Sequence, residues 1–89
     1  MRNNTVLITG GGTGIGQAIS VTFCNSGYDV YILGRRKEKL EKVSNDSNNL
    51  INYFVCDIND NNATKQIINK IGKVDTLINC AGIISSGEE

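Results

Sequence analysis

The sequence predicts an α/β fold, in which about four parallel strands form a doubly wound sheet in the order 3-2-1-4 and three helices cover it. Short apolar runs alternate with helical segments along the 89 residues. Such an alternation requires right-handed crossover connections and therefore a parallel sheet. The first apolar run also leads into a glycine-rich turn that is followed by a helical pattern. No repeat or linker interrupts the chain, so we expect one domain over residues 1–89.

The expected elements follow from hydrophobic periodicity and from turn residues. We expect strands at residues 5–9, 29–33, 52–56 and 75–79. We expect helices from the glycine turn to residue 26, over 37–43 and over 60–71, with a polar loop over 44–49. Gly27 and Gly72 are suited to end the first and third helices, and Asp60 to cap the third. The apolar face expected for the first helix consists of Ile15, Ala18, Ile19, Thr22 and Phe23.

The composition is that of a globular chain without a strong electrostatic field. Nine basic residues balance nine acidic ones, and the isoelectric point is near 6.2. The net charge therefore favours neither nucleic acid nor an anionic membrane as a partner. No apolar run approaches the roughly 20 residues of a membrane span, and residues 1–4 leave no room for a signal peptide before the first strand. We expect a cytoplasmic protein.

Histidine is absent, which excludes histidine-based catalytic triads and histidine metal clusters. The three cysteines, Cys24, Cys56 and Cys80, are widely spaced and include no Cys-x-x-Cys pair. We expect them to be reduced and buried, and we expect no metal site.

Residues 6–16 combine an apolar strand, a turn made mostly of glycine and the start of a helix. This arrangement points backbone N–H groups, at the positive end of a helix, toward an anion. The stretch therefore predicts a phosphate-bearing ligand, and an ordinary glycine-rich turn without a ligand is the alternative.

The spacing of the glycines separates the phosphate-binding motifs. A Walker A loop requires Lys and Ser or Thr where this chain has Gln17 and Ala18, so the triphosphate chemistry is lost. The common fingerprint G-x-G-x-x-G fails because Ile15 and Gln17 stand at the third-glycine positions. The pattern that fits is Thr-Gly-x-x-x-Gly-x-Gly, at Thr9, Gly10, Gly14 and Gly16.

This pattern resembles the nucleotide-binding signature of the short-chain dehydrogenase/reductase family, whose fold is a Rossmann-like doubly wound sheet. The family's other branch requires glycine at position 13, where this chain has Thr13. Two further similarities follow downstream: Asp57 comes after an apolar strand, and residues 79–82, Asn-Cys-Ala-Gly, resemble the family's Asn-Asn-Ala-Gly motif. The resemblance covers residues 5 to about 84 but only the first half of a family member. It implies that the chain is the N-terminal portion of a longer domain.

The glycine positions have separate expected roles. Gly10 allows the tight turn, Gly14 lets the backbone approach a pyrophosphate, and Gly16 lets the helix pack closely on the sheet. We expect the backbone N–H of Ile15 to donate to the pyrophosphate and its side chain to pack. In the family, the counterpart of Thr9 ties the glycine loop to the motif after the fourth strand.

The end of the second strand favours NADP over NAD. An NAD site has Asp or Glu there to accept from the ribose 2′-hydroxyl, whereas this chain has Gly34 followed by Arg35 and Arg36. A guanidinium group suits a 2′-phosphate, and the hydroxyl of Thr13 is placed to add a further contact. The alternative is that the two arginines form a solvated helix start.

The resemblance implies roles for the two later segments. The carboxylate of Asp57 would accept from the adenine amino group, although a turn or cap role is the alternative. The segment that begins at Asn79 would support the sheet and lie against the nicotinamide-side ribose. The expected cofactor-binding residues are Gly10, Gly12, Thr13, Gly14, Ile15, Gly16, Arg35, Arg36, Asp57, Ile58, Asn79, Ala81 and Gly82.

No catalytic residue can be assigned. The family transfers hydride between a nicotinamide and an alcohol or carbonyl substrate with a Tyr-x-x-x-Lys pair and a serine, but Tyr28, Tyr31 and Tyr53 are not followed by lysine at that spacing. We therefore expect an NADP(H)-binding portion of a short-chain oxidoreductase that is inactive by itself. A non-catalytic dinucleotide-binding or regulatory module is the alternative. The resemblance further implies a small-molecule substrate, and homo-oligomers for full-length members.

Overall fold

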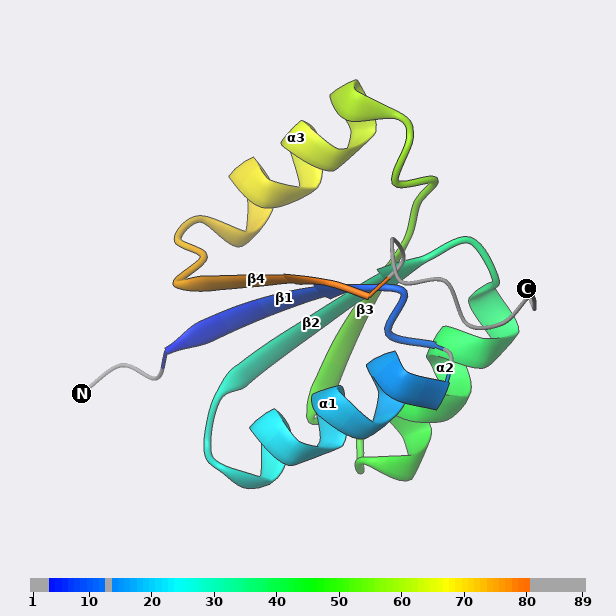
Figure 1. Cartoon of the computed structure of the whole chain (residues 1–89), viewed down its shortest axis with the longest axis vertical. Coiled ribbons are helices and arrows are strands. Elements are labelled where there is room, and N and C mark those ends of the chain that lie inside the picture. Colours follow the sequence, from blue (N-terminus) through cyan, green and yellow to red (C-terminus); the bar gives the residue numbers. More distant parts are fainter. Residues whose placement is uncertain (1–3, 13, 81–89) are drawn as a thin grey trace.

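The computed structural model describes residues 4–12 and 14–80. Strands and helices alternate in the order β1 (Thr5–Thr9), α1 (Gly14–Asn25), β2 (Asp29–Gly34), α2 (Lys37–Asp46), β3 (Ile51–Val55), α3 (Asn61–Ile71) and β4 (Thr76–Asn79). The four strands form one parallel sheet in the order β3-β2-β1-β4 (Figure 1). The predicted fold class and strand order are confirmed.

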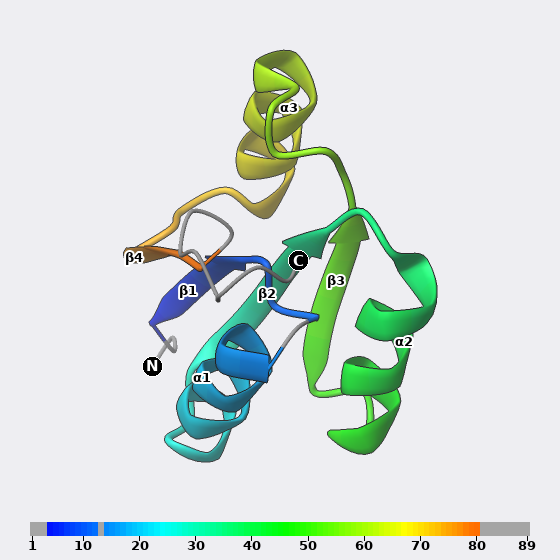
Figure 2. The same ribbon diagram turned by 45° about the vertical axis from the view of Figure 1, so that its right-hand side comes forward.

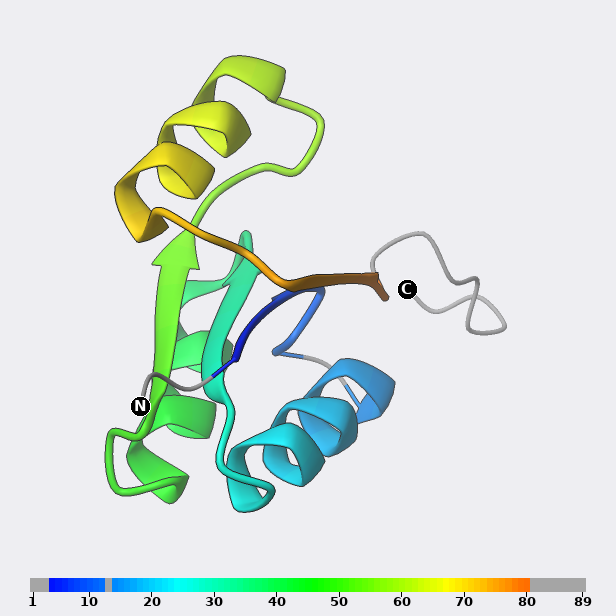
Figure 3. The ribbon, with the colours of Figure 1, turned by 90° about the vertical axis from the view of Figure 1, so that its left-hand side faces the viewer.

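Helices cover both faces of the sheet. Helices α1 and α2 lie on one side and α3 on the other (Figures 1 and 3). Strand β1 serves both layers, because Val6 and Ile8 pack toward α1 and α2 while Leu7 packs toward α3, and all three are fully buried. Burying one such side chain completely contributes about 1.5–3 kcal/mol. Among the described residues, no helix is long and apolar enough to cross a membrane.

The sheet has an open side at β4. This strand pairs with β1 along residues 76–79, and no strand among the described residues pairs with its other edge. Leu77, which lies beside Leu7 in the register, is 59% exposed. An edge of this kind is a site where another chain can pair.

Several element boundaries differ from the predicted ones: β2 ends one residue later, β4 begins one residue later and α1 ends one residue earlier, and larger or double shifts affect α2 and β3. The helix expected to end at residue 43 continues to Asp46, because Ser44 is buried on the inner side of α2 and Lys42 forms an ion pair with Asp46 at 3.0 Å. The reversal follows at Asn48 and Asn49, which adopt positive φ angles of 59° and 64°. Asparagine tolerates this conformation better than most residues. Strand β3 begins and ends one residue earlier than predicted.

The predicted apolar face of α1 is wrong in part. Gly16 and Ser20 are the buried residues of this helix, and Ile19 and Phe23 pack against the core beside them. The Ser20 hydroxyl is satisfied by donating to the carbonyl of Gly16 at 2.7 Å. The buried stripe is therefore rotated toward Gly16, the position at which the helix comes closest to the rest of the protein.

The ends of α1 and α3 agree with the predicted capping and terminating residues. Gly27 has a φ of 91°, and the N–H of Tyr28 donates to the carbonyl of Phe23 at 3.1 Å, with the two rings in edge-to-face contact. The Asp60 carboxylate caps α3 by accepting from the N–H of Ala63 at 3.1 Å. Both features satisfy backbone groups that a helix leaves without partners at its ends.

The cap of α3 can be tested by substitution. Asp60→Ala removes the acceptor for the Ala63 N–H, and we expect it to lower the free energy of unfolding by about 1 kcal/mol. Urea denaturation followed by circular dichroism measures the change. Asp60→Asn should keep most of the stability, and Asp46→Ala, which removes only an exposed ion pair, should change it little. Equal losses in the Ala and Asn variants would contradict the capping role.

Candidate functional site

The residues predicted to form the site follow the carboxyl ends of adjacent strands. In the register, Thr9 of β1 lies opposite Leu33 of β2 and Asn79 of β4, and Gly34 lies opposite Val55 of β3. Figure 2 shows β2 and β3 ending side by side, with the chain after β2 turning into α2. The glycine turn, the two arginines, Asp57 and Asn79 therefore emerge along one edge of the sheet, where ligands of such folds bind.

The turn after β1 is held against β2. Gly10 adopts a φ of 76°, which favours glycine, and its N–H donates to the carbonyl of Leu33 at 2.8 Å. A side chain at Gly11 would collide with Ile32. The need for glycine at position 11 was not predicted, although the run of three glycines in the sequence was the available signal.

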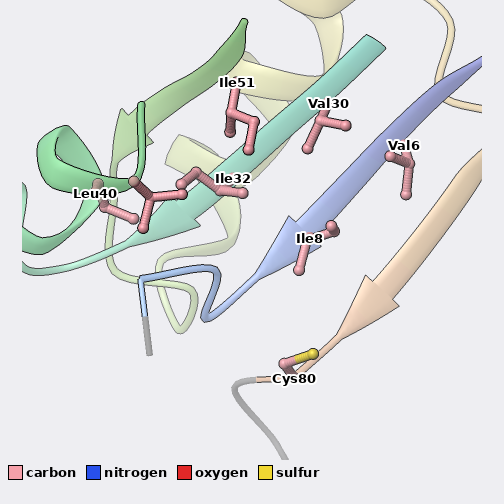
Figure 4. Close-up of a cluster of buried hydrophobic side chains, with 8 residues drawn as sticks. Val6, Ile8, Val30, Ile32, Leu40, Ile51 and Cys80 are labelled. Carbon is pink, nitrogen blue, oxygen red and sulfur yellow. The ribbon is translucent and has the colours of Figure 1, made fainter. Parts of the chain in front are cut away.

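Leu40 of α2 fills the space between the glycine turn and the end of β2. Its Cδ2 lies 3.2 Å from the position that a Cβ would take at Gly12, and the same distance from a Cβ placed at Gly34. The side chain is only 1% exposed and lies beside Ile32 in the core (Figure 4). Both glycines therefore leave room for Leu40, which keeps the first turn of α2 close to the glycine turn.

Gly14 and Gly16 have different surroundings. A side chain at Gly16 would collide with the carbonyl of Gly10, so glycine is required there as predicted. The close contact is with the turn, however, and not with the sheet. A Cβ at Gly14 would have no atom within 4 Å from other described parts of the chain, apart from its own neighbours and helix backbone. The packing of the described residues therefore does not require glycine at position 14, and the approach of a ligand there stays a prediction.

Ile15 departs from the prediction. Its side chain was expected to pack, but it is 51% exposed. Side chains tilt toward the N-terminus of a helix, and Ile15 is the second residue of α1, so it lies beyond the part of the helix that contacts the core. The first N–H groups of a helix have no partner within it and carry the positive end of its dipole. Ile15 thus combines an accessible apolar side chain with a backbone donor.

Thr9 connects β1 to β4, as the resemblance implied. Its hydroxyl donates to the Oδ1 of Asn79 at 2.8 Å, and its carbonyl accepts from the N–H of Cys80 at 3.0 Å. Cys80 is buried against the core, and this burial raises the pKa of its thiol. The three cysteines are free thiols: Cys56 and Cys80 are buried as expected, and Cys24 is half-buried.

Arg35 and Arg36 are both exposed and lie between β2 and α2. Arg36 is the N-cap residue of α2, with an extended backbone and no side-chain capping bond. Within residues 4–12 and 14–80, the ion pairs are Lys42–Asp46 and Lys73–Asp75, so neither arginine is neutralised by a described carboxylate. Both cations are therefore available to an anion at the end of β2.

The carboxylate of Asp57 is exposed, and its Oδ1 accepts from the N–H of Asn59 at 2.9 Å. This bond is the turn role that the sequence left as an alternative, and the adenine contact stays a prediction. Ile58 is half-buried beside it. Three other predicted site residues, Thr13, Ala81 and Gly82, lie outside the described residues.

Together these features suit an extended ligand with a central anion. The start of α1 offers backbone donors beside the open space at Gly14, and Ile15 offers an apolar surface. Basic side chains lie at the β2 end of the site and the Thr9–Asn79 pair at the β4 end. A dinucleotide has phosphates in its middle and rings at both ends.

Comparison with known proteins agrees with this geometry. The sequence profile of the family described as short chain dehydrogenase matches residues 4–89. A serine 3-dehydrogenase from Rhizobium radiobacter is 35% identical over 85 residues, which cover 91% of this chain and 34% of the relative. An oxidoreductase from Bacillus subtilis is 34% identical over 94 residues, which cover 98% of this chain and 34% of the relative. The chain therefore spans about a third of the length of these relatives.

Solved structures share the fold. A 3-ketoacyl-(acyl-carrier-protein) reductase from Brucella melitensis, complexed with NADH, has a TM-score of 0.72 and 31% identity, covering 83% of this chain and 32% of that one. A short-chain dehydrogenase/reductase from Saccharomyces cerevisiae has a TM-score of 0.78 and 30% identity, covering 94% of this chain and 36% of that one.

The two helix glycines should respond differently to alanine. Gly16→Ala places a methyl group against the Gly10 carbonyl, and we expect it to lower the free energy of unfolding by about 1–3 kcal/mol. Gly14→Ala enters open space at the start of a helix and should leave stability unchanged or slightly higher, because alanine favours helix. Urea denaturation of both variants tests this, and equal destabilisation would contradict the assigned contacts.

The cysteines should differ in their rates of alkylation. Only a thiolate reacts, and burial raises the pKa of the Cys80 thiol above its ordinary value. We expect iodoacetamide at pH 8 to label Cys80 more slowly than half-buried Cys24, and we expect labelling of Cys80 to accelerate as the pH rises toward its pKa. Peptide mapping by mass spectrometry measures each site. In urea the two alkylation rates should converge. Equal rates for Cys24 and Cys80 in the native protein would contradict the burial of Cys80.

Proposed function

Because the chain belongs to the short-chain dehydrogenase family, we propose that it is the NADP(H)-binding portion of a short-chain oxidoreductase. Members of the family bind NAD(P) and are oxidoreductases. The observation that carries the proposal is the open glycine turn at the start of α1, with Gly34, Arg35 and Arg36 beside it at the end of β2. When bound, the nicotinamide would supply the hydride for an alcohol or carbonyl substrate.

The central phosphates match the start of α1. Gly14 is exposed, and no described side chain or backbone outside its own helix lies within 4 Å of an added Cβ, so a pyrophosphate can approach the backbone there. The N–H groups of the first turn, that of Ile15 among them, would donate to its oxygens. The glycine turn fits a pyrophosphate because it is held in place against β2. The N–H of Gly10 donates to the carbonyl of Leu33.

The end of β2 supports NADP over NAD. A carboxylate at position 34 would accept from a ribose 2′-hydroxyl, but this position is Gly34, and Leu40 occupies the adjacent space. Arg35 and Arg36 follow with exposed guanidinium groups, which suit a 2′-phosphate. The Brucella reductase was solved with NADH, whereas this chain would prefer NADPH if the two arginines act as proposed.

Fewer contacts support the proposed binding residues for the adenine and nicotinamide ends of the cofactor. Asp57 and Ile58 follow β3 and are proposed to border the adenine, with the Oδ1 of Asp57 also serving its turn. Asn79 is proposed to lie near the nicotinamide-side ribose, where its bond with Thr9 holds the ends of β1 and β4 together. Thr13, Ala81 and Gly82 are proposed to complete the set.

The catalytic groups of such an enzyme are not among these 89 residues, since no tyrosine is followed by lysine at the fourth position. A completed enzyme would act on a small alcohol or carbonyl compound, in the cytoplasm and as a homo-oligomer. The alternative to this function is a dinucleotide-binding or regulatory module without catalysis. The two functions share the binding step and differ in turnover.

Binding of the 89-residue chain to NADPH and NADH, measured by isothermal titration calorimetry, tests the cofactor proposal. We expect NADPH to bind more tightly, because each charge-assisted contact to a 2′-phosphate contributes about 1.5–3 kcal/mol. Arg35→Met should weaken NADPH binding at least about tenfold and Arg36→Met somewhat less, with NADH binding unchanged. Lys42→Met, a charge change on a residue paired with Asp46, is the control. Equal affinity of the wild type for both cofactors would overturn the assignment to NADP.

The same chain should not oxidise NADPH in the presence of a carbonyl substrate. An absorbance assay at the nicotinamide band measures this directly, with a complete short-chain reductase as the positive control. Turnover by the 89 residues would contradict the proposed lack of catalysis.

A further inference from the structure

Lys39 lies directly beside the glycine turn. Its Cβ is 3.3 Å from the position that a Cβ would take at Gly12, although the two residues are 27 positions apart in the sequence (39 minus 12). The Lys39 side chain is exposed. With bonds of about 1.5 Å, an extended lysine carries its nitrogen about 5 Å beyond the Cβ. The ammonium group of Lys39 can therefore reach a ligand bound along the glycine turn.

The position of Lys39 is set by its neighbour in the helix. Leu40 is buried under the turn and contacts the positions of both Gly12 and Gly34. The backbone N–H groups of Lys39 and Leu40 both donate to the carbonyl of Arg36 at 3.2 Å. The first turn of α2 is therefore anchored to the site, and Lys39 cannot move away from the glycine turn without exposing Leu40.

The charge on this side of α2 has no described counter-ion. Lys39 borders the glycine turn, and Arg36 precedes it at the N-cap of the same helix. Among the described residues the lysines in ion pairs are Lys42 and Lys73. Like charges held close together repel one another, and an anion between them removes this repulsion.

We infer that Lys39 is a specificity-determining residue of the proposed site, whose ammonium group binds the 2′-phosphate of NADP together with Arg35 and Arg36; this depends on the NADP-binding function proposed above. The pyrophosphate is served by the backbone at the start of α1, on the other side of the glycine turn. Lys39 projects from α2, the helix that follows the two arginines. Its partner is therefore the phosphate on the adenosine ribose.

Adenosine 2′,5′-bisphosphate and adenosine 5′-monophosphate differ only in the 2′-phosphate, so they isolate this contact. Lys39→Met keeps the apolar stem beside Gly12 and removes the charge. We expect it to weaken binding of the bisphosphate by about tenfold, which equals about 1.4 kcal/mol, and to leave binding of the monophosphate unchanged. Lys39→Arg should retain most of the affinity for the bisphosphate. Calorimetry on the 89-residue chain measures all four combinations.

Lys42→Met is the matched control, because Lys42 lies on the same helix but pairs with Asp46. It should bind both nucleotides as the wild type does. The loss caused by Lys39→Met should shrink in 0.5 M salt, since screening weakens exposed charge pairs. Unfolding midpoints of the variants confirm that the fold is kept.

The outcomes separate this inference from the proposed function. If the wild type prefers the bisphosphate and Arg35→Met removes the preference, while Lys39→Met binds like the wild type, the role of Lys39 is excluded and the NADP site stands. Equal losses for both nucleotides in Lys39→Met would also exclude it. A wild type that does not distinguish the two nucleotides would overturn both the NADP site and the role of Lys39.

Discussion

The close contact between the start of α1 and the turn after β1 is the constraint on which the rest of the site depends. Gly16 lies against the carbonyl of Gly10, where no side chain fits, and the N–H of Gly10 is bonded to Leu33 of β2. The helix is thus brought close to the sheet edge through the turn. Its first N–H groups are left beside the open space at Gly14, so the same contact also presents backbone donors to the proposed anion site.

Two further contacts hold the neighbouring elements in place. Leu40 joins α2 to the glycine turn and to the end of β2, and the bond between Thr9 and Asn79 joins the ends of β1 and β4. Each links segments distant in the sequence at the same edge of the sheet. Because binding is strongest when donors and charges are placed before the ligand arrives, this arrangement suits a cofactor site.

Much of the fold was predictable because it follows from local periodicity and from general rules for parallel sheets. The errors arose where a single distant contact overrides the local pattern. Hydrophobic periodicity assigned Ile15 to the inner face of α1, but the closest approach occurs at Gly16, and this rotates the buried stripe toward Ser20. The end of α2 was placed too early, because Ser44 is polar but buried against the core side of the helix.

By itself, the sequence determined the alternation of elements and the spacing of Thr9, Gly10, Gly14 and Gly16. It also determined that two arginines follow a glycine at the position where an NAD site would have a carboxylate. These properties are encoded within short segments. Only the tertiary structure decided that Gly12 faces Lys39 and Leu40, and that Thr9 bonds to Asn79. Such pairs are separated by 27 or more residues, so their contact depends on how the crossovers bring the strand ends together.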